Sequence, residues 1–384
     1  MHVLKTMKLS AAALLVCGAA LPAAANPTIN LIDIGGVTGS AAEEGFRIAA
    51  KYWESVLTNN AVINFQVGYA PLPPHVLGST GSNLAQYVPI SAYYGALGAT
   101  GTSALDALAV AHLSALSPTG SVNVTVPDYL NPATFSGVAP SGTRIAPDGT
   151  NISATMALST ANLKALTGGY TSVIDARIQF SSDFAFDFNP SNGISAGKYD
   201  FIGVAVHEMG HALGFISGAD DFNYSVGPDF PTDDYWWGYG MDMFRYSAPG
   251  VLDWSFGTSS YFSLDGGVTP YLDGYLSTGE DYGDGWQASH WKRPGGAPCV
   301  DFRGIMNPYI CNGLTDAVTG LDLALFDAIG WNTNIDVSTH PDYHFSTAQM
   351  FRAFAVPEPE GWTLMLAGLG LMAAVMRRRR PASS

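Results

Sequence analysis

Two histidines and a glutamate near the middle of the chain have the types and spacing of a metal-dependent hydrolytic site. The segment reads His207-Glu208-Met209-Gly210-His211. Residues four apart lie on one face of an α-helix, so both imidazoles can face the same metal ion. A catalytic zinc takes three protein ligands and keeps a fourth position for water, whose pKa falls to about 7. We therefore expect His207 and His211 to bind Zn²⁺, and Glu208 to activate the zinc-bound water and protonate the leaving amine.

The third ligand does not follow directly. In the short-spaced form of this motif, a histidine comes three residues after a glycine equivalent to Gly214, and this chain has Ser217 there. A serine hydroxyl is a poor zinc ligand, so the third ligand must come from elsewhere in the chain. His290, in Ser289-His290-Trp291, is the main candidate.

Two other ligand schemes stay open. Glu280 and Asp284 have the Glu-x-x-x-Asp spacing of zinc proteases that use a helical glutamate as third ligand. Three glycines in and around this segment argue against a helix there. Asp220 or Asp221 is the other alternative, although neither occupies the position of the motif's third ligand.

The sequence after His290 carries a resemblance to a known family. Met306 lies in a short turn, Gly-Ile-Met-Asn-Pro, sixteen residues after His290, and an apolar segment ending at Gly330 follows. Together with residues 207–214, the stretch 289–331 resembles the leishmanolysin-like metzincins. In that family a long insertion precedes the third histidine, and a methionine turn lies beneath the metal.

The resemblance implies zinc ligation by His207, His211 and His290, a base role for Glu208, and a turn role for Met306. It does not cover most of the N-terminal half or the segment between the two matching stretches, which agree only in general layout. The body also has two cysteines where leishmanolysin is disulfide-rich. The closer relatives are therefore expected among exported bacterial metalloproteases.

Both ends of the chain are predicted to be processing signals. Residues 1–25 contain two lysines, an apolar run and Ala-Ala-Ala before Asn26, the layout of a secretory signal peptide that signal peptidase removes. Residues 356–384 contain Pro-Glu-Pro, an apolar run over 361–376 and four arginines. This order resembles the PEP-CTERM sorting signal of Gram-negative bacteria, which an exosortase processes; an ordinary C-terminal anchor is the alternative. We expect export to the cell surface or beyond, with membrane attachment through this segment before processing.

The charge of the chain narrows its partners. It has 17 Lys and Arg against 32 Asp and Glu, a formal net charge of −15, and several of the basic residues lie in the two terminal signals. Such an acidic body disfavours nucleic acid as a partner. Calcium binding by acidic loops is a weaker expectation, because the aspartates lack the regular spacing of an EF-hand and a solvated acidic surface is the default. Those aspartates are Asp220, Asp221, Asp233 and Asp234.

The two cysteines that remain after the leader flank Met306. Because an exported protein meets oxidising conditions, we expect Cys299 and Cys311 to form a disulfide that fixes the methionine turn. Closing a loop of about a dozen residues contributes roughly 3 kcal/mol. Two free buried thiols are the alternative.

Periodicity predicts the elements that hold these residues. Helical spacing follows a capping box at Ser40, and Asp200 can cap the metal-bearing helix, which ends at Gly214. Helices are predicted over 40–57, 103–113, 201–213 and 321–329, and half-buried strands over 63–67 and 176–180.

These elements predict an α+β fold with the two lobes of a zincin, as in the metzincins. Residues 26–215 would form an N-terminal lobe of sheet and helices that includes the active-site helix. Residues 216–335, rich in Gly, Asp, Tyr and Trp, would form an irregular C-terminal lobe with the third ligand and the methionine turn. Residues 336–355 are expected to link the body to the sorting signal.

The predicted function is a secreted or cell-surface zinc endopeptidase acting on protein or peptide substrates, bound extended along an edge strand of the N-terminal lobe. The alternative is a non-catalytic surface or matrix binding protein on a zincin-derived scaffold. Glu208 favours the enzyme, because a scaffold has no need of a base. Tyr309 could stabilise an oxyanion, but a packing role is favoured.

Overall fold

A four-stranded sheet supports the helix that carries the histidine motif. The computed structural model describes residues 26–74, 76–168, 173–293, 299, 302–355 and 372, so the predicted signal peptide and almost all of the predicted sorting signal lie outside the described residues. The strands, in spatial order, are β1 (Thr28–Asp33), β2 (Val62–Ala70), β8 (Ala176–Ser181) and β3 (Gly78–Ser82). The first three are parallel, and β3 is an antiparallel edge strand. The predicted strands over 63–67 and 176–180 are central in this sheet.

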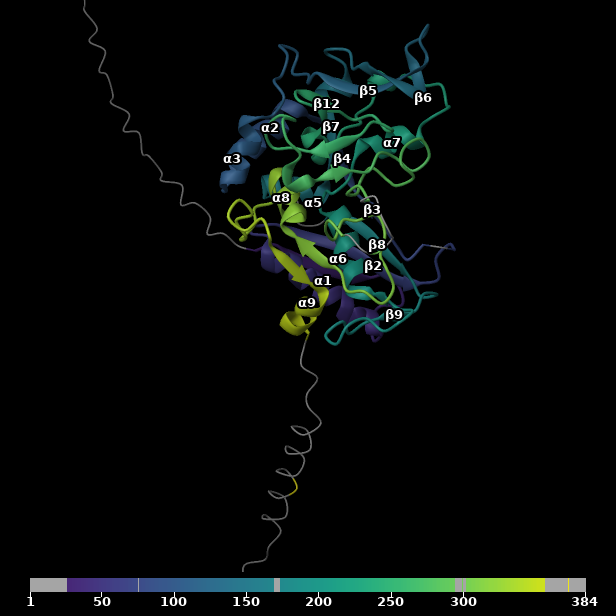
Figure 1. The fold of residues 1–384 in the computed structure, drawn as a ribbon, viewed down its shortest axis with the longest axis vertical. Coiled ribbons are helices and arrows are strands. Elements are labelled where there is room, and N and C mark those ends of the chain that lie inside the picture. Colours follow the sequence, from purple (N-terminus) through teal and green to yellow (C-terminus); the bar gives the residue numbers. More distant parts are fainter. Residues whose placement is uncertain are drawn as a thin grey trace, which may run out of the picture.

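Two helices cover the sheet and fix the position of the histidine motif. Helix α1 (Ala41–Val56) begins after its N-cap Ser40, and α6 (Phe201–Ala212) begins after Asp200, whose side chain accepts a hydrogen bond from the Gly203 N–H at 3.0 Å. Gly214, with φ of +118°, ends the turn that follows α6. α6 packs between α1 and the edge strand β3, as Figure 1 shows. The predicted helix and its cap are confirmed.

A second sheet combines strands from both halves of the chain. Its spatial order is β14 (Tyr275–Leu276), β13 (Ser260–Phe262), β11 (Arg245–Ala248), β12 (Val251–Asp253), β5 (Val124–Asn131) and β6 (Ser136–Ile145). β12 pairs in parallel with β5, Leu252 opposite Val124. The region after residue 216 therefore completes a sheet begun by upstream strands, across the boundary that we expected between two lobes. Local periodicity does not record a pairing between residues this far apart.

The remaining elements complete the α+β architecture predicted from the sequence. The helices are α2 (Ile90–Thr100), α3 (Ala104–Ala111), α4 (Asn151–Ala154), α5 (Thr160–Thr167), α7 (Gly218–Tyr224), α8 (Gly320–Ala328) and α9 (Thr347–Phe354), with 3₁₀ turns at Thr232–Asp234, Met241–Phe244 and Tyr271–Asp273. The strand pairs are β4 (Leu84–Pro89) with β7 (Thr155–Ser159), β9 (Phe186–Asp187) with β10 (Tyr199–Asp200), and β15 (Ala317–Thr319) with β16 (His344–Ser346). No helix among the described residues has the length and apolarity needed to cross a membrane.

Residues 336–355, which we expected to be a linker, contain ordered structure packed on the body. β16 pairs antiparallel with β15, and α9 packs against α1. The side chains of Thr347 and Met350 are fully buried. A capping box of Ser346 and Gln349 begins α9, and it is this short amphipathic helix that the sequence analysis did not recognise.

Buried tryptophans hold the helix of the histidine motif at two points. The Trp53 indole N–H donates to the Val206 carbonyl at 3.2 Å, and the Trp331 indole N–H donates to the Leu213 carbonyl at 2.7 Å. Both rings are fully buried in the hydrophobic core. The helix that carries His207 is therefore held by α1 at Val206 and by the chain after α8 at Leu213, about two turns further along.

Candidate metal centre

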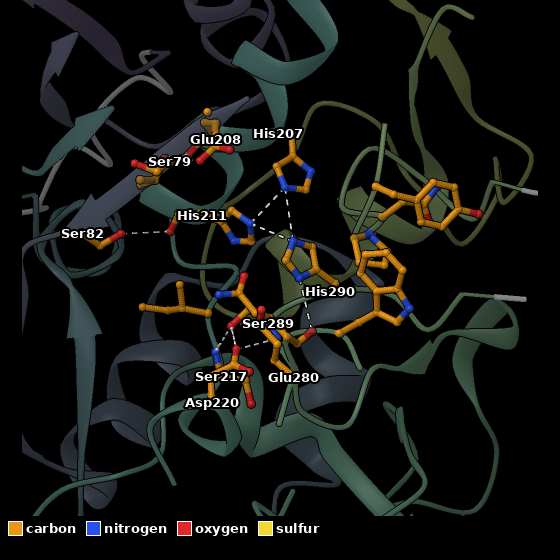
Figure 2. Close-up of a pocket in the computed structure, with 18 of the residues that line it drawn as sticks. Ser79, Ser82, His207, Glu208, His211, Ser217, Asp220, Glu280, Ser289 and His290 are labelled. Atoms are coloured by element: carbon orange, nitrogen blue, oxygen red, sulfur yellow. Dashed lines mark hydrogen bonds between the residues drawn. The ribbon is translucent and has the colours of Figure 1, made fainter. Parts of the chain in front are cut away.

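Three histidines converge on one point beneath the edge strand. The Nε2 atoms of His207 and His211 lie 3.1 Å apart, those of His211 and His290 3.2 Å, and those of His290 and His207 3.3 Å. Figure 2 shows the rings pointing toward one another, two from α6 and one from the segment before Trp291. His207 and His290 are buried, and His211 is partly buried.

The hydrogen bond at Nδ1 of each ring fixes the tautomer of that ring. Nδ1 lies 2.7 Å from the Ile305 carbonyl in His207, 2.8 Å from the Phe215 carbonyl in His211, and 3.2 Å from the Gln287 carbonyl in His290. A carbonyl oxygen only accepts, so each Nδ1 carries the hydrogen and each Nε2 presents a lone pair. Three lone pairs that face one another repel, and a cation at their centre removes the repulsion.

The spacing of the three nitrogens fits zinc. Nitrogen ligands about 2.0–2.1 Å from Zn²⁺ at tetrahedral angles lie about 3.3–3.4 Å apart. The observed separations of 3.1–3.3 Å fall close to this value. Within the described part of the chain, these three histidines are the group whose ligand atoms lie close enough together to hold a metal ion.

Burial keeps two of these imidazoles, those of His211 and His290, neutral. It lowers the pKa of His211 to about 3, and the neighbouring His207 adds to the effect. Burial also lowers the pKa of His290 well below its ordinary value, again with a contribution from the other two rings. Neutral imidazole is the form that binds a metal.

Glu208 lies beside the triad with its carboxylate held by the edge strand. The Thr80 hydroxyl lies 2.7 Å from Glu208 Oε2 and 3.0 Å from the Glu208 carbonyl oxygen. A Cβ atom on Gly78 would come within 3.2 Å of Glu208 Oε1, so the glycine leaves room for the carboxylate. Burial raises the pKa of Glu208, and the nearby His207 and the Thr80 hydroxyl oppose that shift. A buried carboxylate with one oriented oxygen is suited to accept a proton.

Met306 packs against the histidine motif at Gly210, which lies between His207 and His211. An ideal Cβ on Gly210 would come within 2.5 Å of the Met306 sulfur. The glycine thus allows the methionine, which is fully buried, to contact the helix backbone. The Met306 carbonyl also accepts a hydrogen bond from the Trp291 N–H at 3.0 Å, next to His290.

A buried carboxylate that the sequence analysis did not single out holds this turn. Asp322 accepts hydrogen bonds from the N–H groups of Ile305 at 2.9 Å and Met306 at 3.3 Å, and from the Trp291 indole at 2.8 Å. It also closes the capping box with Thr319 at the start of α8. The pattern Thr-x-x-Asp before an apolar run is a recognisable helix start, but it does not reveal the second set of partners.

The predicted disulfide is confirmed. Cys299 and Cys311 are bonded, with their Cα atoms 5.9 Å apart, and the chain between them contains Met306. Tyr309, in the same loop, packs near the rings of Trp286 and Phe302, with centroids 5.8 and 6.0 Å away. These contacts agree with the packing role favoured for Tyr309.

The alternative ligands do not join the triad. The Glu280 carboxylate accepts a hydrogen bond from the Tyr224 hydroxyl at 2.8 Å, and the Asp221 carboxylate accepts one from the Tyr239 hydroxyl at 2.6 Å. Asp220 is buried against backbone N–H groups at 288 and 289. Asp233, considered for calcium, pairs with Arg144 at 2.6 Å.

A cleft of about 720 Å³ opens over the triad. One wall is the edge strand β3, and the opposite wall comes from the segment around residues 280–290 and the turn after Met306. The Leu77 carbonyl accepts a hydrogen bond from the Ser181 N–H, and the Asn83 N–H donates one to the Asp175 carbonyl. Every second residue of β3, counted from Leu77, therefore directs its backbone groups toward β8. The residues whose backbone groups face away from β8 are Gly78, Thr80 and Ser82.

Comparison with known proteins identifies the end of the chain. Residues 355–380 match the PEP-CTERM protein-sorting motif. The predicted sorting signal is thereby confirmed, and it implies an exported, surface-directed protein that an exosortase processes. No curated protein and no solved structure matches the chain.

Proposed function

We propose that the protein is an exported zinc endopeptidase of the leishmanolysin-like metzincin type. The observation that carries the proposal is the histidine triad, whose three Nε2 lone pairs lie 3.1–3.3 Å apart beside the Glu208 carboxylate. A metzincin-like layout is supported by the parallel sheet with its antiparallel edge strand, the metal-bearing helix, and Met306 beneath that helix.

The residues of the site divide the work of peptide hydrolysis. When bound, zinc supplies a Lewis acid that acidifies water and polarises the substrate carbonyl. Glu208 accepts the proton of the attacking water and then delivers it to the leaving amine. Thr80 binds Oε2 of that carboxylate, and Glu208 lines the cleft.

The edge strand offers a binding surface for an extended peptide. Backbone groups of Gly78, Thr80 and Ser82 face away from β8, and among the described residues no strand follows β3 in the sheet. A substrate added as a further strand would satisfy these groups and pass over Glu208. Hydrogen bonds to the backbone of a substrate do not depend on its side chains, so such a surface can bind peptides of many sequences.

The test compares zinc content and casein hydrolysis in four proteins. Wild type should bind one zinc and cleave casein. Glu208→Gln should keep its zinc and lose about 10²–10⁴-fold in activity, because the amide cannot accept the proton. His290→Ala should lose zinc, whereas His112→Ala, at an exposed histidine that ends α3, should keep it. Stoichiometric zinc in His290→Ala would contradict the ligand assignment.

A non-catalytic matrix or surface binding protein is the second candidate, since the sorting motif suits either function. Zinc-loaded wild type that cleaves neither casein nor a broad peptide panel would favour it over the peptidase.

A further inference from the structure

The segment that carries His290 is held by a buried carboxylate on α7. Asp220, 7% exposed, accepts hydrogen bonds from the Ala288 N–H at 2.6 Å, the Ser289 N–H at 2.9 Å and the Ser289 hydroxyl. These are the two residues immediately before the histidine. Figure 2 shows Asp220 and Ser289 side by side below the His290 ring.

These bonds close the turn that orients the imidazole. His290 Nδ1 donates to the Gln287 carbonyl at 3.2 Å, so the direction of the ring depends on the turn from 287 to 290. Both intervening N–H groups end on the Asp220 carboxylate. The turn has therefore no freedom to rotate without breaking at least two buried hydrogen bonds.

Ser217 connects the same segment to the end of the metal-bearing helix. Its N–H donates to the Ser289 hydroxyl oxygen at 3.0 Å, and its hydroxyl donates to Asp242 at 2.6 Å. Asp242 also accepts from the Gly218 N–H at 2.7 Å, which fixes the start of α7. The serine at the position of the short-spaced third ligand thus docks the segment that carries the more distant histidine.

We propose that Asp220 is a positioning residue for the metal centre: it places His290 Nε2 opposite the two histidines of α6. This role rests on the metal site of the proposed function. Removing the carboxylate leaves two N–H groups and a hydroxyl buried without an acceptor, so the turn relaxes and the third nitrogen moves off the metal position. The Gln287 carbonyl is the partner of the His290 ring, and loss of such a partner typically weakens metal binding about 10–100-fold. Asp220 holds the turn that presents this carbonyl.

Asp221 provides a matched control. It is the next residue on the same helix and lines the same cleft, but its carboxylate accepts from the Tyr239 hydroxyl and makes no hydrogen bond to the His290 segment among the described contacts. The proteins compared are wild type, Asp220→Ala, Asp220→Asn, Ser289→Ala and Asp221→Ala, each as the full chain.

The measurements are the zinc dissociation constant, by competition with a chromophoric chelator, and the visible spectrum of the Co²⁺-substituted protein. Urea unfolding of the metal-free protein reports stability separately. We expect about 10–100-fold weaker zinc binding and an altered Co²⁺ spectrum in Asp220→Ala and Asp220→Asn, and less than about threefold weakening in Asp221→Ala. Ser289→Ala, which loses one hydroxyl, should weaken zinc binding by an intermediate factor.

Unchanged zinc affinity and Co²⁺ spectrum in the Asp220 variants would overturn the positioning role, even if metal-free stability falls. If neither Asp220 variant folds, Ser289→Ala decides: an affinity equal to that of Asp221→Ala overturns it. Wild type that binds no zinc overturns the metal site and this role together. Wild type that binds zinc but cleaves no peptide refutes the peptidase and leaves the positioning role standing.

Discussion

Gly210 and Met306 make the sharpest test of the packing beneath the metal site. Gly210 lies between the two ligands of α6, and an added Cβ would come within 2.5 Å of the Met306 sulfur, 3.2 Å of its methyl carbon and 3.5 Å of the Phe326 ring. Ordinary contact begins near the last of these distances. The substitution Gly210→Ala must therefore displace the methionine by about 1 Å, since contacts much shorter than 3.5 Å are repulsive.

Two opposing terms set the size of the effect. Overpacking a buried position costs about 1–3 kcal/mol, and replacing glycine by alanine inside a helix contributes about 1 kcal/mol. In wild type, Gly210→Ala should therefore lower the free energy of unfolding by up to about 2 kcal/mol. In a Met306→Ala background the sulfur is gone, so the same change should stabilise by about 1 kcal/mol.

The assay is a double-mutant cycle by urea unfolding, with metal removed by a chelator so that stability is measured without zinc. Wild type, both single variants and the double variant give a coupling free energy, which we expect at about 1–3 kcal/mol. The close contact is refuted if Gly210→Ala stabilises both wild type and Met306→Ala, by amounts that agree within about 0.5 kcal/mol.

Three further outcomes follow from buried groups. Lys164→Met removes the buried ammonium that lies 2.6 Å from the Asp175 carboxylate, and should lower the free energy of unfolding by about 3–5 kcal/mol. Lys51→Met, at an exposed pair, should lower it by less than about 1 kcal/mol. Serine at both cysteines of the disulfide should lower the free energy of unfolding by about 3 kcal/mol, and a reductant should destabilise wild type but not this variant. Burial raises the pKa of Asp327 from 3.8 to about 7. Between about pH 4 and pH 7 the folded state holds a proton that the unfolded chain releases, so the free energy of unfolding falls as the pH rises through this range. Asp327→Asn should flatten this part of the plot of stability against pH.

The half of the site on α6 was predictable because helix geometry fixes it. His207 and His211 are four positions apart, and that spacing puts both rings on one face wherever the helix lies. His290 has no such relation, since it follows Gly214 by 76 residues, and its assignment came from the resemblance around Met306. The structure brings the same three histidines together.

The residues that position the ligands were beyond sequence analysis. Asp220 was considered as a ligand or a calcium residue, and Asp322 was not considered at all. Both are buried carboxylates whose partners are backbone N–H groups far along the chain. A backbone N–H is present at every residue except proline, so no residue type marks these partners.

The pairing of strands was not predicted, for a related physical reason. The pairing of Leu252 with Val124 joins β12, a strand of three residues, to β5, which lies far earlier in the chain, and neither sequence indicates which strand will be its neighbour. The elements with strong local signals were found instead: α1 and α6 have capping residues, and β2 alternates apolar and polar side chains.

The docking of α9 ties the start of the sorting motif to the folded body. Thr347 donates a hydrogen bond from its hydroxyl to Asp200, the residue that caps the metal-bearing helix, and its N–H donates to the Asp316 carbonyl at 2.9 Å. The sorting motif begins at residue 355, one residue after α9 ends. A pull on the motif would therefore load α9 first, and Thr347 would pass that load to Asp200 at the start of the helix that carries His207.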